Sequence, residues 1–221
     1  MSIRLQAIDI SALLPPPGPS PIVLASMPDR PSLTPADASA LAARVRTGDE
    51  RAFHTLYIVY FHTLCAFTRT LTNSRETAEE YVQDVFADWW ERRATIRIEH
   101  GVRAYLYGAV RYRVFNARRH DRVVQAQAAI AIQSDEPIGM GTPDPSAATT
   151  VELTEFSTAV AHAIAALPPA RRTALILRVT HGLDYTEIAA TMGISPQAAM
   201  THVSRARSAL RPLFDEFFRP E

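Results

Sequence analysis

The chain has 221 residues, and its 23 basic and 23 acidic side chains give a formal net charge of zero, so bulk charge alone does not indicate a nucleic-acid partner. No apolar run approaches the roughly 20 residues that a membrane-spanning helix needs, and the N-terminus lacks the pattern of a secretory signal. The single cysteine, Cys65, excludes an internal disulfide. We therefore expect a cytoplasmic protein with no membrane insertion, large enough for one large domain or two small ones.

Residues 1–38 form a proline-rich extension that we expect to be disordered. From Asp37 onward, apolar residues recur at steps of three and four, which is typical of amphipathic helices. The segment Thr47-Gly48-Asp49 divides this stretch into a pair of helices, and Thr72-Asn73-Ser74 ends the pair and caps the next helix.

The charge then changes sign abruptly. Residues 76–91 contain six acids and no base, whereas residues 92–122 contain nine arginines and two acids. Trp89 and Trp90, the two tryptophans of the chain, lie at the junction. The acidic face is either simply solvated or an interaction surface; acids far from the helix N-terminus gain nothing from the helix dipole, which favours the second interpretation.

A short polar loop, residues 94–101, leads to a helix predicted over 102–119. Arginines and tyrosines alternate along it, a combination suited to phosphate contact and base stacking. Arginine-rich helix faces are also often only solvated, so this pattern alone leaves both interpretations open.

Residues 122–150 lose this periodicity and are predicted to be a flexible linker. Further helices follow from Val151, with Pro168-Pro169 opening one of them. We found no alternation typical of strands and no internal repeat. The predicted fold class is all-α, with two small helical domains over 39–121 and 151–216.

The second domain ends in a predicted helix-turn-helix over 184–211. Asp184 and Glu187 have the spacing of a capping box, Gly193 suits a tight turn, and Ser195-Pro196 suits the start of a second helix. A recognition helix of this kind places its N-terminal residues at base edges in the major groove. A purely structural helical hairpin is the alternative.

Together, residues 53–93 and 166–211 resemble a bacterial RNA polymerase sigma factor of the extracytoplasmic-function group. The resemblance implies binding to core RNA polymerase, through its β′ clamp and β flap, and recognition of the −35 and melting of the −10 promoter elements. It also implies an anti-sigma protein as partner and a linker that runs near the polymerase active centre. It implies no enzymatic activity, cofactor, metal or small-molecule substrate.

The resemblance assigns site residues to three groups. The polymerase-contacting group is Glu80, Gln83, Asp84 and Phe86. The −10 group, which also includes a base-holding loop over 95–100, is Trp89, Trp90, Arg92, Arg93, Arg103, Tyr105, Arg111, Tyr112 and Asn116. The −35 group is Ser195, Pro196, Gln197, Met200, Thr201, His202, Arg205 and Arg207.

The recognition helix departs from the family pattern. Ala198-Ala199 stands where a Thr-Val pair is usual, Met200 where lysine is usual, and His202 where arginine is common. Fewer cations predict a weaker grip on phosphate. A DNA-binding regulator that acts alone and a helical protein-interaction module remain as alternative functions.

Overall fold

The part of the chain that the structure describes consists of helices and connecting turns. The computed structural model describes residues 33–72, 74–128 and 151–217, and the side chains of residues 33–72, 74–120 and 159–213. The predicted all-α class is confirmed. Most of the predicted proline-rich extension, and the predicted linker from residue 129 on, lie outside the described residues.

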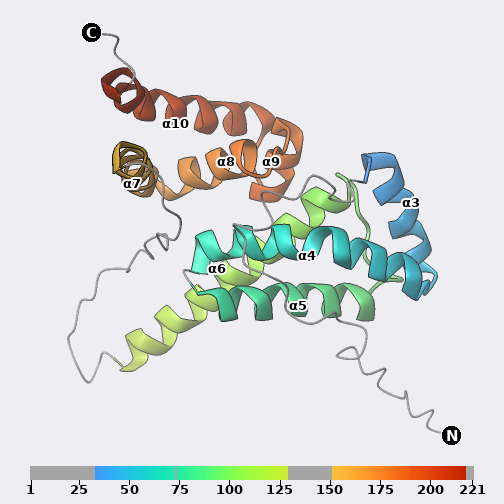
Figure 1. Cartoon of the computed structure of the whole chain (residues 1–221). Coiled ribbons are helices and arrows are strands. Elements are labelled where there is room, and N and C mark those ends of the chain that lie inside the picture. The colour runs from blue at the N-terminus through green and yellow to red at the C-terminus, as the bar shows by residue number, and fades with distance from the viewer. Residues whose placement is uncertain (1–32, 73, 129–150, 218–221) are drawn as a thin grey trace, which may run out of the picture.

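The first helical unit contains α3 (Pro35–Arg46), α4 (Glu50–Thr72), α5 (Arg75–Glu91) and α6 (Val102–Ala128) (Figure 1). Thr34 caps α3 by accepting a hydrogen bond from the Asp37 backbone N–H, and Ser74 caps α5 in the same way through Thr77. The predicted breaks at 47–49 and 72–74 are confirmed. Helix α6 continues past the predicted end at residue 119 and takes up the first part of the predicted linker.

Aromatic and aliphatic residues of α4 form the centre of this unit. Their buried positions follow the predicted stripe, and α5 and α6 pack against them. The Tyr57 ring lies 4.8 Å from Phe61 and 4.9 Å from Phe86 between centroids, which joins α4 to α5. The segments of opposite charge, α5 and α6, are therefore held side by side on α4.

The second unit contains α7 (Val151–Ala166), α8 (Pro169–Val179), α9 (Tyr185–Met192) and α10 (Pro196–Phe217). Leu167, Leu175, Ala206 and Leu210 form a small core between α8 and α10. Arg172 donates hydrogen bonds to the backbone carbonyls of Ile164 (3.1 Å), Ala165 and Leu167 (3.0 Å), which ties the end of α7 to α8.

The two units also pack against each other, which the sequence did not predict. One continuous apolar cluster contains residues of α4 and α6 together with residues of α8, α9 and α10. Figure 1 shows α9 lying against α6, where the first unit meets the second. None of the described helices combines the length and apolar character needed to cross a bilayer.

Candidate functional site

The acidic face of α5 is partly neutralised by arginines. Asp84 pairs with Arg113 of α6 at 2.5 Å, and Asp88 pairs with Arg92 at 3.2 Å. Glu80 and Gln83 are exposed and form no ion pair or hydrogen bond with the described part of the chain. Because exposed ion pairs contribute little stability, these contacts mainly orient the side chains. Glu80 and Gln83 are therefore the polymerase-group residues most available to a partner.

Three residues predicted at binding surfaces lie instead in the core. Phe86 is 1% exposed, Trp89 2% and Trp90 7%. The Phe53 ring of α4 lies 6.0 Å from Phe86, 6.1 Å from Trp89 and 4.9 Å from Trp90 between centroids. Large aromatic side chains contribute most to the stability of the fold when they are fully buried, which favours the interior positions of these three rings. In this structure the three rings pack α5 on α4, and the contacts of Phe86 with polymerase and of the tryptophans with DNA stay predictions.

The two arginines that follow the tryptophans differ in their contacts and in their exposure. Arg93 donates a 2.6 Å hydrogen bond to the Trp90 carbonyl, and its guanidinium lies 4.4 Å from the centre of the Trp90 ring. Arg92 is exposed and paired with Asp88. Arg92 is therefore the more available of the two for phosphate.

Helix α6 carries the remaining −10 residues on two faces: Tyr105, Tyr112 and Asn116 share one, and Arg103 and Arg111 lie on another. Tyr112 is 69% exposed, Asn116 is exposed, and Tyr105 is half-buried against Trp89. The Arg111 guanidinium lies 4.7 Å from the centre of the Phe115 ring, and its buried Nε has no hydrogen-bond partner in the described chain. Burial lowers the pKa of Arg111.

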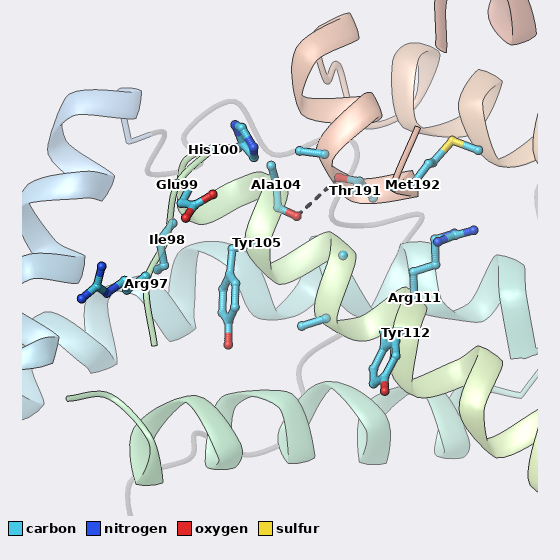
Figure 2. Close-up of a pocket in the computed structure, with 14 residues that line it drawn as sticks. Arg97, Ile98, Glu99, His100, Ala104, Tyr105, Arg111, Tyr112, Thr191 and Met192 are labelled. Carbon is cyan, nitrogen blue, oxygen red and sulfur yellow. Dashed lines mark hydrogen bonds between the residues drawn. The ribbon is translucent and has the colours of Figure 1, made fainter. Parts of the chain in front are cut away.

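The loop before α6, the side of α6 and the end of α9 line an open cavity of about 460 Å³. Figure 2 shows Arg97 to His100 on one side of it, Tyr105, Arg111 and Tyr112 along α6, and Thr191 and Met192 of α9 above them. Residues from both helical units therefore line the cavity, and the expected base-holding loop forms one of its walls.

The helix-turn-helix has the predicted local geometry. Asp184 Oδ1 accepts from the Glu187 backbone N–H at 2.8 Å, and Glu187 Oε2 accepts from the Asp184 N–H at 2.9 Å, which completes the capping box. Gly193 has φ 68°, a left-handed conformation that favours glycine. Ser195 Oγ accepts from the Ala198 N–H at 3.2 Å and caps α10. The predicted turn and both caps are confirmed.

The N-terminal part of α10 presents a short mixed surface. Its exposed residues include Ser195, Pro196, Gln197, Met200 (42%), Arg205 and Arg207. Thr201 and His202 are half-buried, and the Thr201 hydroxyl donates to the Gln197 carbonyl at 2.8 Å. The first exposed cation of this helix is therefore Arg205.

Sequence reasoning missed the residues where the two units meet. His181 Nδ1 and the Tyr107 hydroxyl share a hydrogen bond of 3.0 Å, and the Thr191 hydroxyl lies 3.4 Å from the Ala104 carbonyl. Tyr107 and His181 are 74 positions apart in sequence. Contacts at such separations leave no local pattern.

Comparison with known proteins supplies the family. Residues 56–123 match the family model described as Sigma-70 region 2, and residues 157–210 match Sigma-70, region 4. The chain belongs to the sigma-70 family. Its two matched regions correspond to the two helical units, so the predicted membership in the extracytoplasmic-function group of sigma factors is confirmed.

This sigma factor is similar to the RNA polymerase sigma-H factor of Pseudomonas aeruginosa, with 27% identity over 83% of this chain and 99% of that protein. It is 26% identical to the RNA polymerase sigma factor CnrH of Cupriavidus metallidurans, over 83% of this chain and 97% of that one.

Two solved structures share its fold. Against CnrH in complex with the cytosolic domain of CnrY, the TM-score is 0.57 with 22% identity, covering 81% of this chain and 98% of that one. Against the sigma factor RpoE in complex with the anti-sigma factor NepR from Bartonella quintana, it is 0.56 with 23% identity, covering 74% and 96%.

Proposed function

We propose that this sigma factor binds core RNA polymerase through the acidic face of α5 and directs initiation by contacting the −10 element with α6 and the −35 element with α10. The observation that carries the proposal is the placement of an exposed acidic face, a tyrosine- and arginine-bearing helix and a helix-turn-helix in one chain. A regulator that binds DNA alone leaves the acidic face without a role.

Transcription in vitro tests this function. The chain is added to core RNA polymerase with a pool of genomic fragments, and transcripts are mapped by their 5′ ends. We expect initiation at a defined set of sites that core polymerase alone does not use. Binding of the chain to DNA, without any such initiation, would instead support the alternative of a regulator that acts alone.

The polymerase contact is tested by charge reversal at Glu80. Asp84 is less suitable because its substitution also breaks the ion pair with Arg113. We expect Glu80→Arg to weaken binding to core polymerase by about tenfold or more, because like charges then face each other. Glu50→Arg makes the same charge change at an exposed residue of α4 and should bind normally. Equal binding by both variants would show that α5 does not form part of the interface with polymerase.

The proposed −10 contact is made by arginines and tyrosines of α6. We expect Tyr112→Ala to lose about 1–3 kcal/mol of single-stranded DNA binding, the usual contribution of one base–aromatic stack. Polymerase binding should be unchanged, because Tyr112 lies on α6 and not on the acidic face. A binding measurement for each partner separates the two effects.

An anti-sigma protein is the proposed regulatory partner. Solved relatives of this fold are described in complex with the cytosolic domain of CnrY and with the anti-sigma factor NepR. A protein of this kind should block initiation when it is added to this chain before core polymerase. A candidate that binds the chain without reducing initiation would not be that partner.

A further inference from the structure

The first two turns of α10, the recognition helix, carry an uncharged stripe made of Gln197, Met200 and Thr201. These residues recur at steps of three and four, which places them on one side of the helix. Gln197 and Met200 are exposed, and Thr201 is half-buried. The buried residues of α10, Ala199 and Val203 among them, lie on a different side. The uncharged stripe is therefore the part of α10 that is open to the edges of base pairs.

Hydrogen bonds within α10 restrict which groups of the stripe can reach a base. The Thr201 hydroxyl donates to the Gln197 carbonyl at 2.8 Å, so its proton is used inside the helix and its methyl group is left for outside contacts. The Gln197 side chain forms no hydrogen bond with the described part of the chain. Gln197 therefore supplies the polar group of the stripe, an amide that both donates and accepts hydrogen bonds.

The cations of α10 lie beside the stripe and further along the helix. Arg205 and Arg207 are exposed, and because successive helical residues are turned by about 100°, these two arginines flank the stripe on either side. Arg205 is about 12 Å along the helix from Gln197. His202 lies off the stripe and is half-buried, with its Nδ1 buried and without a hydrogen-bond partner in the described chain. Because the N-terminal residues of a recognition helix meet the bases, flanking arginines at this distance suit phosphates.

The chemistry of the stripe favours one kind of base pair. Guanine is read mainly by arginine or lysine and cytosine by a carboxylate, whereas glutamine binds the N6 and N7 of adenine through two hydrogen bonds. Residues 194–204 contain no arginine, lysine, aspartate or glutamate. Apolar groups such as the Met200 thioether and the Thr201 methyl suit the C5-methyl group of thymine. The stripe therefore has the groups that read A·T pairs and lacks the charged groups that read G·C pairs.

The rise of the helix sets the spacing of these contacts. Met200 and Thr201 follow Gln197 by three and four residues, which is about 4.5–6 Å along the helix axis. Stacked base pairs are about 3.4 Å apart. In a helix that lies along the groove, Met200 and Thr201 therefore meet a base pair one or two steps from the pair that meets Gln197.

We infer that α10 of this sigma factor reads A·T pairs in the −35 element: Gln197 binds the N6 and N7 of an adenine, and Met200, with the Thr201 methyl group, contacts a thymine methyl one or two base pairs away. Arg205 and Arg207 hold phosphates and read no base. This inference rests on the proposed function, because it names the bases that the proposed −35 contact recognises.

Selection from random duplexes tests this base preference. Duplex DNA with a randomised stretch is bound by the chain with core polymerase and, in a parallel arm, by the chain alone, and the enriched sequences are read. We expect an element with an adenine and, one or two base pairs away, a thymine. Gln197→Arg should change the preference at the adenine position to guanine, because a guanidinium matches the O6 and N7 of guanine. A wild-type element of guanine and cytosine at the position that Gln197→Arg alters would overturn the inference.

Base analogues in the selected duplex test each contact without changing the protein. 7-Deazaadenine lacks the N7 acceptor, so we expect it to weaken wild-type binding by about tenfold and to have no further effect on Gln197→Ala. Uracil lacks the thymine methyl, so it should weaken wild-type binding by about fourfold, as expected for one methyl group, and have no further effect on Met200→Ala. An analogue that weakens the wild type and its matched variant equally would overturn the assignment of that contact.

Arg207→Ala is the matched control for a contact that carries no sequence information. We expect it to weaken binding to the selected duplex and to random duplexes by the same factor, and to reduce the slope of log K against log salt by about one unit. Its base preference should equal that of the wild type. A changed base preference in this variant would overturn the division between base-reading and phosphate-binding residues.

Failure of the proposed function has a different signature. In that case the chain adds no initiation sites to those of core polymerase, while the chain alone still enriches duplexes with the A·T element. Conversely, initiation at defined sites whose upstream sequence does not respond to the Gln197 and Met200 variants would overturn this inference and leave the function standing. A chain that enriches no duplex in either arm would overturn both.

Discussion

At the scale of single residues, burial separates structural from contacting side chains around the charge reversal. Trp89 and Trp90 pack on Phe53, while Arg92 beside them is exposed. Burying an indole ring stabilises the fold more than leaving the ring exposed to solvent at the surface. The three- and four-residue spacing of Val82, Phe86 and Trp89 predicts burial for these side chains, whereas the position of Trp90 depends on how α5 leans on α4.

We expect Trp89→Ala to lower the free energy of unfolding by about 3–5 kcal/mol, because it leaves a cavity beside Phe53 and Phe86. Urea denaturation measures this loss. Arg92→Ala, an exposed change three residues away, should cost less than about 1 kcal/mol. A Trp89 variant of native stability with lost DNA binding would place this ring at the DNA instead.

Met200 is the residue that most distinguishes this recognition helix from the usual family pattern. It is 42% exposed on α10, among residues that carry no charge before Arg205. An exposed thioether can contact thymine methyl groups but neutralises no phosphate.

We therefore expect Met200→Lys to strengthen binding to all DNA sequences alike and to steepen the dependence of log K on log salt by about one unit. Titrations of duplex DNA at several salt concentrations give this slope. Met200→Leu, which adds no charge, should leave the slope unchanged. A lysine variant with the wild-type slope would place this position away from the phosphates.

At the scale of elements, arginines add polar contacts between helices that also share apolar packing. Arg172 of α8 donates to three carbonyls at the end of α7, and Arg113 of α6 reaches Asp84 of α5. The last carbonyls of a helix have no intrahelical partner, so a guanidinium there satisfies several at once.

We expect Arg172→Met to destabilise region 4 by roughly 1.5–3 kcal/mol, since hydrogen bonds to a charged group are lost and carbonyls are left unsatisfied. Arg171→Met, at the neighbouring half-buried arginine, removes none of these bonds and should have little effect. Thermal unfolding followed by circular dichroism compares the pair. Similar losses of stability in both variants would mean that removal of a positive charge, and not of these hydrogen bonds, causes the effect.

At the scale of the whole molecule, His181 makes the packing of the two units sensitive to acid. Burial, and secondly the charge of Arg103, lower its pKa from 6.5 to about 4. The groups around it are Phe67 of α4, Tyr107 and Arg103 of α6, and Glu187 of α9, which pairs with Arg103. Because His181 binds a proton more readily when the two units are apart, their packing is fully stable above about pH 6.5 and weakens as the pH falls towards 4.

We expect the ratio of chains with the two units packed together to chains with the units apart to fall by about tenfold between pH 7.5 and pH 5.5. Spin labels at the exposed positions Thr70 and Ser208 report the distance between the units. His181→Gln removes the titrating group and should show no such change. A wild-type ratio that stays constant over this pH range would show that protonation of His181 does not control the packing of the two units.

The sequence by itself determined the helices, their caps, the helix-turn-helix and the separation of acidic from basic residues. These features depend on neighbours within about four positions, such as Asp184 with Glu187 or Ser195 with Ala198. Residue spacing and side-chain chemistry are sufficient to predict them.

Only the tertiary structure decided which side chains remain available. It buried Trp90, paired Asp84 with Arg113, and placed α9 over the side of α6. Each of these outcomes joins residues of different helices, and Tyr107 and His181 come from different regions. Packing between distant segments depends on complementary shape and on burial, which no local pattern of residues records.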